Sequence, residues 1–155
     1  MTQLSPQLTR PVRILLVEDS LGDERLAVIA LERAKVANEL HVCRDGEDAL
    51  DYLHGRGPHE GRPDPDLVLL DLNLPRKSGF EVLDELKQDE CLRRIPVVVL
   101  TTSSAEEDVA RSYHLHANSY ITKPVTLDGL AQVATAIDNF WVQIVTLAPG
   151  DCRTR

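Results

Sequence analysis

Five residues with chemically useful side chains stand at the ends of apolar runs in this sequence. A charge beside such a run costs free energy unless something stabilises it, so these positions ask for a chemical explanation. The residues are Glu18 and Asp19 after "ILLV", Asp71 after "LVLL", Thr101 after "VVVL" and Lys123 after "SYIT".

Three carboxylates held close together would repel one another, and a bound cation would remove that cost. Mg²⁺ suits such a group because it binds through one or two carboxylates together with water and phosphate oxygens. The site could then accept a phosphoryl group, which requires an oxygen nucleophile, a metal and positive charge. Asp71 is predicted to be the nucleophile, and Lys123 and the Thr101 hydroxyl are predicted to pair with phosphoryl oxygens.

Strand and helix patterns alternate around these residues along the chain. Unbroken apolar runs predict buried strands, and apolar residues at helical spacing predict amphipathic helices. Because parallel strands need crossover helices, the pattern indicates an α/β fold with a five-stranded parallel sheet. Ligands of such sheets bind beyond the carboxyl ends of the strands, where the five residues fall. Strands are expected at 12–19, 40–43, 66–71, 95–102 and 118–124, helices at 23–36, 46–55, 79–89, 105–116 and from 126 onward, and a loop at 55–65.

Composition narrows the classes of partner. The chain has 155 residues, 43% of them hydrophobic, which fits one domain with an ordinary core. Its formal net charge of -8 should repel nucleic acid and anionic membranes. The first eleven residues have no apolar segment typical of a signal sequence, and no run approaches the ~20 residues that span a bilayer. We therefore expect a cytoplasmic protein with no membrane or nucleic-acid partner.

The placement of these residues resembles the receiver domain of two-component response regulators, from about Arg13 to Val145. That family has an acidic pair after the first strand, a phosphoacceptor Asp after the third, and Thr or Ser after the fourth. An aromatic residue lies in the fifth strand and Lys-Pro follows it. The step of three residues from Tyr120 to Lys123 and the step of 22 from Thr101 to Lys123 are also similar to the family.

The resemblance implies a doubly wound, flavodoxin-like sheet with strand order 2-1-3-4-5 and five helices. It also implies a role for each matching residue. Glu18 stands where many receivers have Asp, a departure that bears on metal geometry and dephosphorylation rate. The implied roles are phosphoacceptor for Asp71, metal ligand for Asp19, Asp71 and the main-chain carbonyl of Asn73, metal ligand through water for Glu18, and switch residue for Thr101 and Tyr120.

Longer stretches resemble single-domain regulators that partner phytochrome histidine kinases of bacteria and cyanobacteria. They include "VVVLTTSSAEEDVARSY", "ANSYITKPV" and "IDNFWVQIVTL". This resemblance implies that a light-sensing kinase, a bacteriophytochrome, donates the phosphoryl group from its own phosphohistidine. The signal would then pass to a downstream protein that the sequence does not identify. We expect a phosphoacceptor with only its own phosphotransfer and dephosphorylation chemistry, and not an enzyme.

Three other functions share parts of this pattern. Phosphatases with an aspartate nucleophile need a second Asp two residues later, where this chain has Asn73. A flavodoxin-type flavin module needs a hydroxyl-rich loop after the first strand, which is missing here. A phosphate sink, which drains a kinase without binding any target, cannot be separated from a messenger by sequence. Tyr120 could also be a simple packing residue.

The ends of the chain are expected to lie outside the main fold. We predict a disordered leader at 1–11, a receiver domain at 12–145 and a C-terminal extension at 146–155. The segment "FWVQIVTL", 140–147, holds the single Trp and one of two Phe residues. Its apolar side chains cannot all face one side of a helix, and exposed apolar patches mark contact surfaces. The C-terminal helix and tail are therefore predicted to form a homodimer; the alternative is that the tail folds back on its own domain.

Overall fold

The computed structural model describes residues 10–33, 37–102, 105–123 and 135. Its five strands form one parallel sheet in the order β2-β1-β3-β4-β5. The predicted α/β class and strand order are confirmed. The strands are β1 Val12–Val17, β2 Asn38–Cys43, β3 Leu67–Leu70, β4 Val97–Thr101 and β5 Ser119–Thr122, and the helices are α1 Leu21–Glu32, α2 Gly46–His54, α3 Gly79–Gln88 and α4 Glu106–His114.

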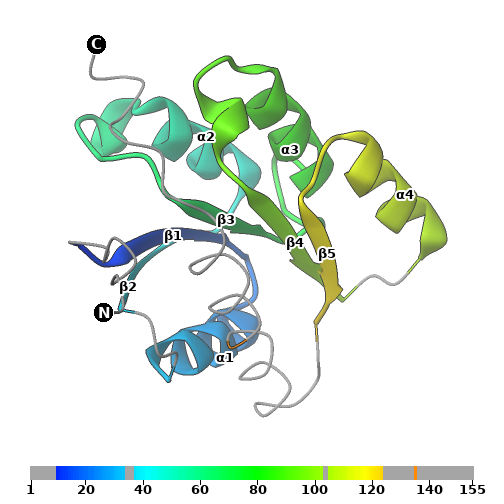
Figure 1. Ribbon diagram of the computed structural model, residues 1–155, viewed down its shortest axis with the longest axis horizontal. Helices are drawn as coiled ribbons and strands as arrows, with labels where there is room; N and C mark the ends of the chain where they lie inside the picture. The colour runs from blue at the N-terminus through cyan, green and yellow to red at the C-terminus, as the bar shows by residue number, and fades with distance from the viewer. Residues whose placement is uncertain (1–9, 34–36, 103–104, 124–134, 136–155) are drawn as a thin grey trace, which may run out of the picture.

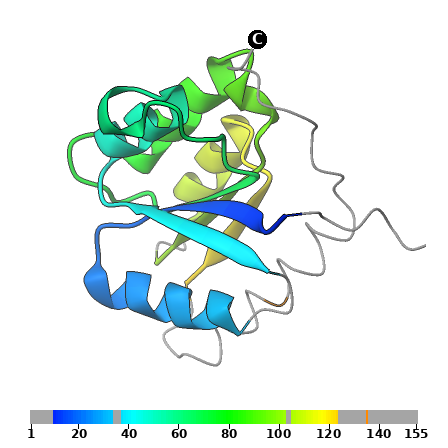
Figure 2. The ribbon, with the colours of Figure 1, turned by 90° about the vertical axis from the view of Figure 1, so that its left-hand side faces the viewer.

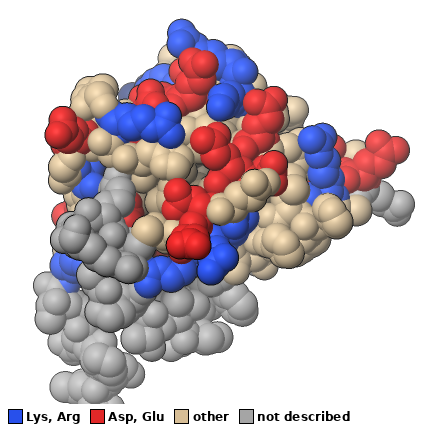
Figure 3. Space-filling view, turned by 90° about the horizontal axis from the view of Figure 1, so that it is seen from above, with Lys and Arg blue, Asp and Glu red and all other residues tan. Residues whose placement is uncertain are grey.

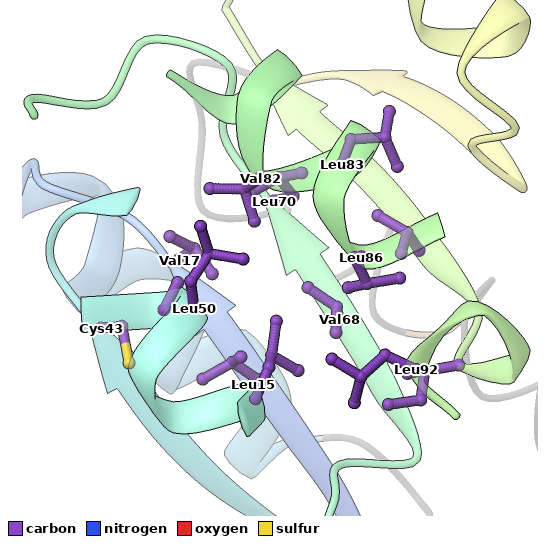
Figure 4. Close-up of a cluster of buried hydrophobic side chains, with 14 of the residues drawn as sticks. Leu15, Val17, Cys43, Leu50, Val68, Leu70, Val82, Leu83, Leu86 and Leu92 are labelled. Carbon is purple, nitrogen blue, oxygen red and sulfur yellow. The ribbon is translucent and has the colours of Figure 1, made fainter. Parts of the chain in front are cut away.

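The described helices cover both faces of the sheet. In Figures 1 and 2, α1 lies on one face, and α2, α3 and α4 lie on the other. Alternate residues of β1 belong to the hydrophobic clusters on opposite faces of the sheet. Leu15 is in the cluster with Leu50 of α2 and Leu83 of α3, whereas Leu16 is in the cluster with Ala27 of α1. Figure 4 shows the first of these clusters. Burial on both faces explains why β1, β3 and β4 are largely apolar without alternation.

The face formed by α2 and α3 carries acidic and basic side chains side by side (Figure 3). Lys77 and Glu85, for example, lie 3.5 Å apart with about two fifths of each side chain exposed, at 40% and 41%. Exposed pairs of this kind contribute roughly 0–1 kcal/mol each. Such pairs therefore contribute little to the stability of the fold.

Hydrogen bonds of the sheet continue to the candidate site residues. The backbone N–H of Glu18 donates to Cys43 O at 2.9 Å, and that of Asp71 donates to Val17 O at 3.1 Å. The N–H of Lys123 donates to the carbonyl of Thr101 at 2.7 Å. The sheet thus holds these residues at its carboxyl edge by their backbones.

Helix α3 begins against the backbone of Asp71. A Cβ atom on Gly79 would lie 2.2 Å from Asp71 O and 2.6 Å from the Cα of Leu72, so no larger residue fits without a shift. The Gly79 N–H donates to Leu72 O at 2.9 Å, and Ser78 caps the helix by accepting from Glu81 N. The loop after Asp71 is therefore fixed by a glycine and a cap.

Some element boundaries differ from those predicted. Helix α1 begins at Leu21, not at residue 23, because Ser20 caps it by accepting from the Asp23 N–H. Leu21 is 67% exposed, so it is not part of the buried apolar face from which the helix is predicted. The predicted loop contains a short 3-10 turn at Gly57–His59.

A search of the described helices finds no candidate for a membrane span. Residues 1–9 of the predicted leader, the fifth helix except Thr135, the tail and its dimer contact lie outside the described residues, whereas Arg10 of the leader is described and pairs with Asp66.

Candidate functional site

Three carboxylates meet at the carboxyl edge of the sheet, as predicted. Glu18 and Asp19 follow β1 and Asp71 follows β3, and each offers an oxygen within 4.8 Å of the other two. Glu18 is 2% exposed and Asp71 7%, whereas Asp19 is exposed. Oxygen donors at this spacing, two buried and one open to solvent, fit a hard cation such as Mg²⁺.

The Lys123 ammonium lies among these carboxylates. Its Nζ donates to Asp71 Oδ2 at 3.1 Å and also to Glu18 Oε1, and the Lys123 side chain is only 8% exposed. It makes a third contact, to Asp23 Oδ2 at 3.0 Å. The lysine therefore reaches from the end of β5 across to the ends of β3 and β1.

The charges of the site are unequal. Burial raises the pKa of the Glu18 carboxyl to about 7; the hydrogen bond from Lys123 opposes this, and the charge of Asp71 adds to it. Burial alone would lower the pKa of Lys123, but its bonds to Glu18 and Asp23 outweigh burial and the pKa is raised. Among the described residues, the site holds four carboxylates and one ammonium, which contacts three of them, so the site attracts further positive charge.

The hydroxyl of Thr101 is a buried polar atom of this site that needs a ligand. Thr101 ends β4, is 0% exposed, and its Oγ1 has no hydrogen-bond partner among the described residues. A buried hydroxyl without a partner costs free energy, so such an atom calls for a reason in function. A phosphoryl oxygen bound at the same edge would supply the acceptor.

The other two predicted residues also lie near this edge. The Asn73 N–H donates to Asp71 Oδ1 at 3.4 Å, which places the backbone of Asn73 beside the predicted nucleophile. Tyr120 is half-buried in β5 and packs against the cluster under α2 and α3. Its backbone N–H donates to the Tyr113 hydroxyl of α4 at 3.2 Å. A change at Tyr120 can thus be transmitted to α4.

Sequence reasoning missed two residues of the site. One is Asp23, in the first turn of α1, which contacts Lys123. The other is Gly79, where any side chain would collide with Asp71 O. An acidic residue three positions after a capping serine was the available signal for Asp23, but the spacing does not tell which group it faces.

A second polar cluster, Cys43, Asp48 and His59, also has donor atoms within 4.8 Å of one another. Here Asp48 Oδ1 is 2.7 Å from His59 Nε2 and also bonds the Cys43 thiol, while His59 Nδ1 has no partner among the described residues. Burial and the neighbouring Asp48 raise the pKa of that thiol, which keeps its proton. His59 also packs edge-on against the Tyr52 ring. We interpret this cluster as a hydrogen-bonded network, the Asp48 network, that anchors the loop after α2.

Comparison with known proteins agrees with the geometry. The family model for the response regulator receiver domain matches residues 14–135. Response regulator Rcp1 of Synechocystis sp. is 49% identical over 144 residues, which cover 93% of this chain and 98% of that protein. These matches confirm the resemblance to receivers stated from the sequence, together with the phosphoacceptor role that membership implies.

Solved structures give the same result. The Mn²⁺-bound form of Rcp1 has a TM-score of 0.82 at 50% identity, covering 89% of this chain and 99% of that chain. The phosphorylated cyanobacterial phytochrome response regulator RcpA has a TM-score of 0.85 at 48% identity, and the match covers 91% of this chain and 100% of that chain. This chain belongs to the family of response regulator receiver domains.

Proposed function

We propose that this receiver accepts a phosphoryl group from the phosphohistidine of a histidine kinase onto Asp71 and signals through altered protein contacts. The observation that carries the proposal is the buried Thr101 hydroxyl, which has no partner in the described part of the chain and lies at the same sheet edge as Asp71 and Lys123. A hydroxyl donor and an ammonium group beside a carboxylate nucleophile are what a transferred phosphoryl group requires.

The chemistry follows from the residues that surround Asp71. A carboxylate oxygen of Asp71 attacks the phosphorus atom, a P–O bond forms, and the P–N bond to the donor imidazole breaks, leaving the electron pair on nitrogen. Lys123 donates to one phosphoryl oxygen and Thr101 to another. When bound, Mg²⁺ would neutralise the charge of the phosphoryl oxygens. Its proposed ligands are Asp19, Asp71 and the Asn73 carbonyl, with Glu18 acting through water.

The output follows from the same contacts. A phosphoryl group adds roughly -1.5 to -2 charges, which draw Lys123 and the Thr101 hydroxyl toward it. Movement of Thr101 vacates space into which Tyr120 turns, and the bond from Tyr120 N to Tyr113 links that motion to α4. Thr101→Ala should leave phosphorylation possible but reduce the chemical-shift changes around Tyr120. An undiminished change would refute this coupling.

The proposed partners extend the resemblance. A bacteriophytochrome is the proposed kinase, supported by the similarity to RcpA and Rcp1.

The proposed division of the chain is a leader at 1–11, a receiver at 12–145 and an extension at 146–155. The C-terminal helix and tail are proposed to form a homodimer. Asn73, where aspartate-nucleophile phosphatases need an acid, supports a phosphoacceptor and not an enzyme. Sedimentation of the intact chain and of one truncated after Asn139 tests the dimer.

Phosphotransfer assays test the proposed function. The protein is incubated with autophosphorylated, labelled histidine kinases, in Mg²⁺ and in excess chelator. Label should transfer only with metal, and Asp71→Asn should abolish it because an amide is a poor nucleophile. Asp84→Asn makes the same chemical change on α3, where Asp84 accepts from Gln88, and should label normally. Full labelling of Asp71→Asn would contradict the assignment.

A further inference from the structure

Asp23 is a fourth carboxylate at the site and is not part of the three-carboxylate group. It lies in the first turn of α1, and its Oδ2 accepts from Lys123 Nζ at 3.0 Å. The candidate metal ligands Glu18, Asp19 and Asp71 lie within 4.8 Å of one another without it. Asp23 therefore touches the site through the lysine.

The start of α1 leaves this carboxylate available. In a capping box, the acid three residues after the capping Ser accepts from the backbone N–H of that Ser. Here the Asp23 N–H donates to Ser20 Oγ at 3.3 Å, but the Ser20 N–H donates to Glu18 Oε2 at 3.2 Å. Because Glu18 occupies the acceptor role, the Asp23 side chain is directed to Lys123.

The three partners of Lys123 differ in depth. The side chains of Glu18 and Asp71 are 2% and 9% exposed, whereas that of Asp23 is 38% exposed. An ammonium group has three donors, and in this structure all three have carboxylate partners. A phosphoryl oxygen on Asp71 can gain a bond from Lys123 only if one of these contacts is released.

We propose that Asp23 is a positioning residue that holds Lys123 in the unphosphorylated state and competes with the phosphoryl group for it. This inference rests on the proposed function. Asp23 is the partner to be released, because it is the most exposed and water can replace the lysine there. The competition biases the receiver toward the unphosphorylated state until the phosphoryl group arrives.

Equilibrium binding of beryllofluoride, a phosphoryl mimic that attaches to carboxylates, tests the competition at saturating Mg²⁺. Asp23→Asn removes the competing charge and should tighten binding roughly two- to fivefold, the range expected for a partly exposed ion pair. Asp23→Glu keeps the charge and should restore the affinity of the unaltered protein. Glu24→Gln is the matched control, because Glu24 is in the same turn but pairs with Arg44.

The outcomes separate this inference from the function on which it rests. No change or weaker binding in Asp23→Asn would overturn the proposal. Equal tightening in Glu24→Gln would also overturn it, because general charge and not the contact with Lys123 would then be responsible. If the unaltered protein does not bind beryllofluoride, or Asp71→Asn binds it equally well, the proposed phosphoacceptor function fails instead.

Discussion

Two polar clusters of this receiver differ in charge balance. The site at Asp71 has four carboxylates for one ammonium among the described residues, and the hydroxyl of Thr101 has no partner there. In the Cys43, Asp48 and His59 cluster, Asp48 accepts hydrogen bonds from the other two, while His59 Nδ1 has no partner among the described residues. The Asp48 network holds a loop, whereas the site at Asp71 has an excess of carboxylates that can bind a cation. The excess of negative charge therefore distinguishes the candidate site from the other cluster.

The largest expected effect is on the charge balance of the site at Asp71. Lys123→Met should lower the free energy of unfolding without metal by about 3 kcal/mol, because buried carboxylates lose their cation. Mg²⁺ should recover part of this loss. Lys77→Met, which breaks the exposed pair with Glu85, should cost at most about 0.5 kcal/mol. Urea unfolding with and without Mg²⁺ measures both variants; equal losses would remove the distinction between site and surface.

The Asp48 network of Cys43, Asp48 and His59 should contribute to stability and not to phosphorylation. His59→Ala removes a buried ring and its bond to Asp48, and should cost roughly 2 kcal/mol of unfolding free energy. Phosphoryl labelling should remain at the level of the unaltered protein, and the exposed His116→Ala serves as the control. A rise in melting temperature with Zn²⁺ that His59→Ala abolishes would show that this cluster is a metal site after all.

Metal affinity of the site at Asp71 should depend on pH. Glu18 has a pKa raised to about 7, so it gains a proton as pH falls through 7 and the site loses a negative charge. Mg²⁺ affinity should therefore decrease from pH 8 to pH 6, by at most about tenfold per pH unit for one proton. Glu18→Gln should flatten the profile. Calorimetric titration over this range measures it, and a constant affinity would refute the role of Glu18.

The smallest effect is expected at Thr101. Thr101→Val keeps the shape but removes the buried hydroxyl, and should raise the unfolding free energy of the unphosphorylated protein by about 1 kcal/mol. The same variant should respond less to phosphorylation. Thermal unfolding and chemical-shift mapping around Tyr120 measure the two effects. A loss of stability would mean that the hydroxyl already has a partner.

Much of the fold and site could be predicted from sequence because strand ends are local features. Apolar runs predicted β1, β3 and β4, the alternation with helices predicted β2 and β5, and parallel topology required Asp71 and Lys123 to meet at one edge. Asp23 could not be found in this way, because its contact depends on how α1 is set against β5. The contact between Gly79 and the Asp71 carbonyl is likewise a matter of three-dimensional packing. Local patterns specify elements, whereas such contacts depend on their assembly.

Identification of the phosphorylated residue tests the central claim most directly. The phosphorylated protein is treated with borohydride, which reduces an acyl phosphate on aspartate to homoserine, and its peptides are mapped by mass spectrometry. The account predicts homoserine at position 71 alone, in a yield that follows the amount of label. Reduction at Asp19 or Asp23 with position 71 unchanged, or label that borohydride does not remove, would contradict it.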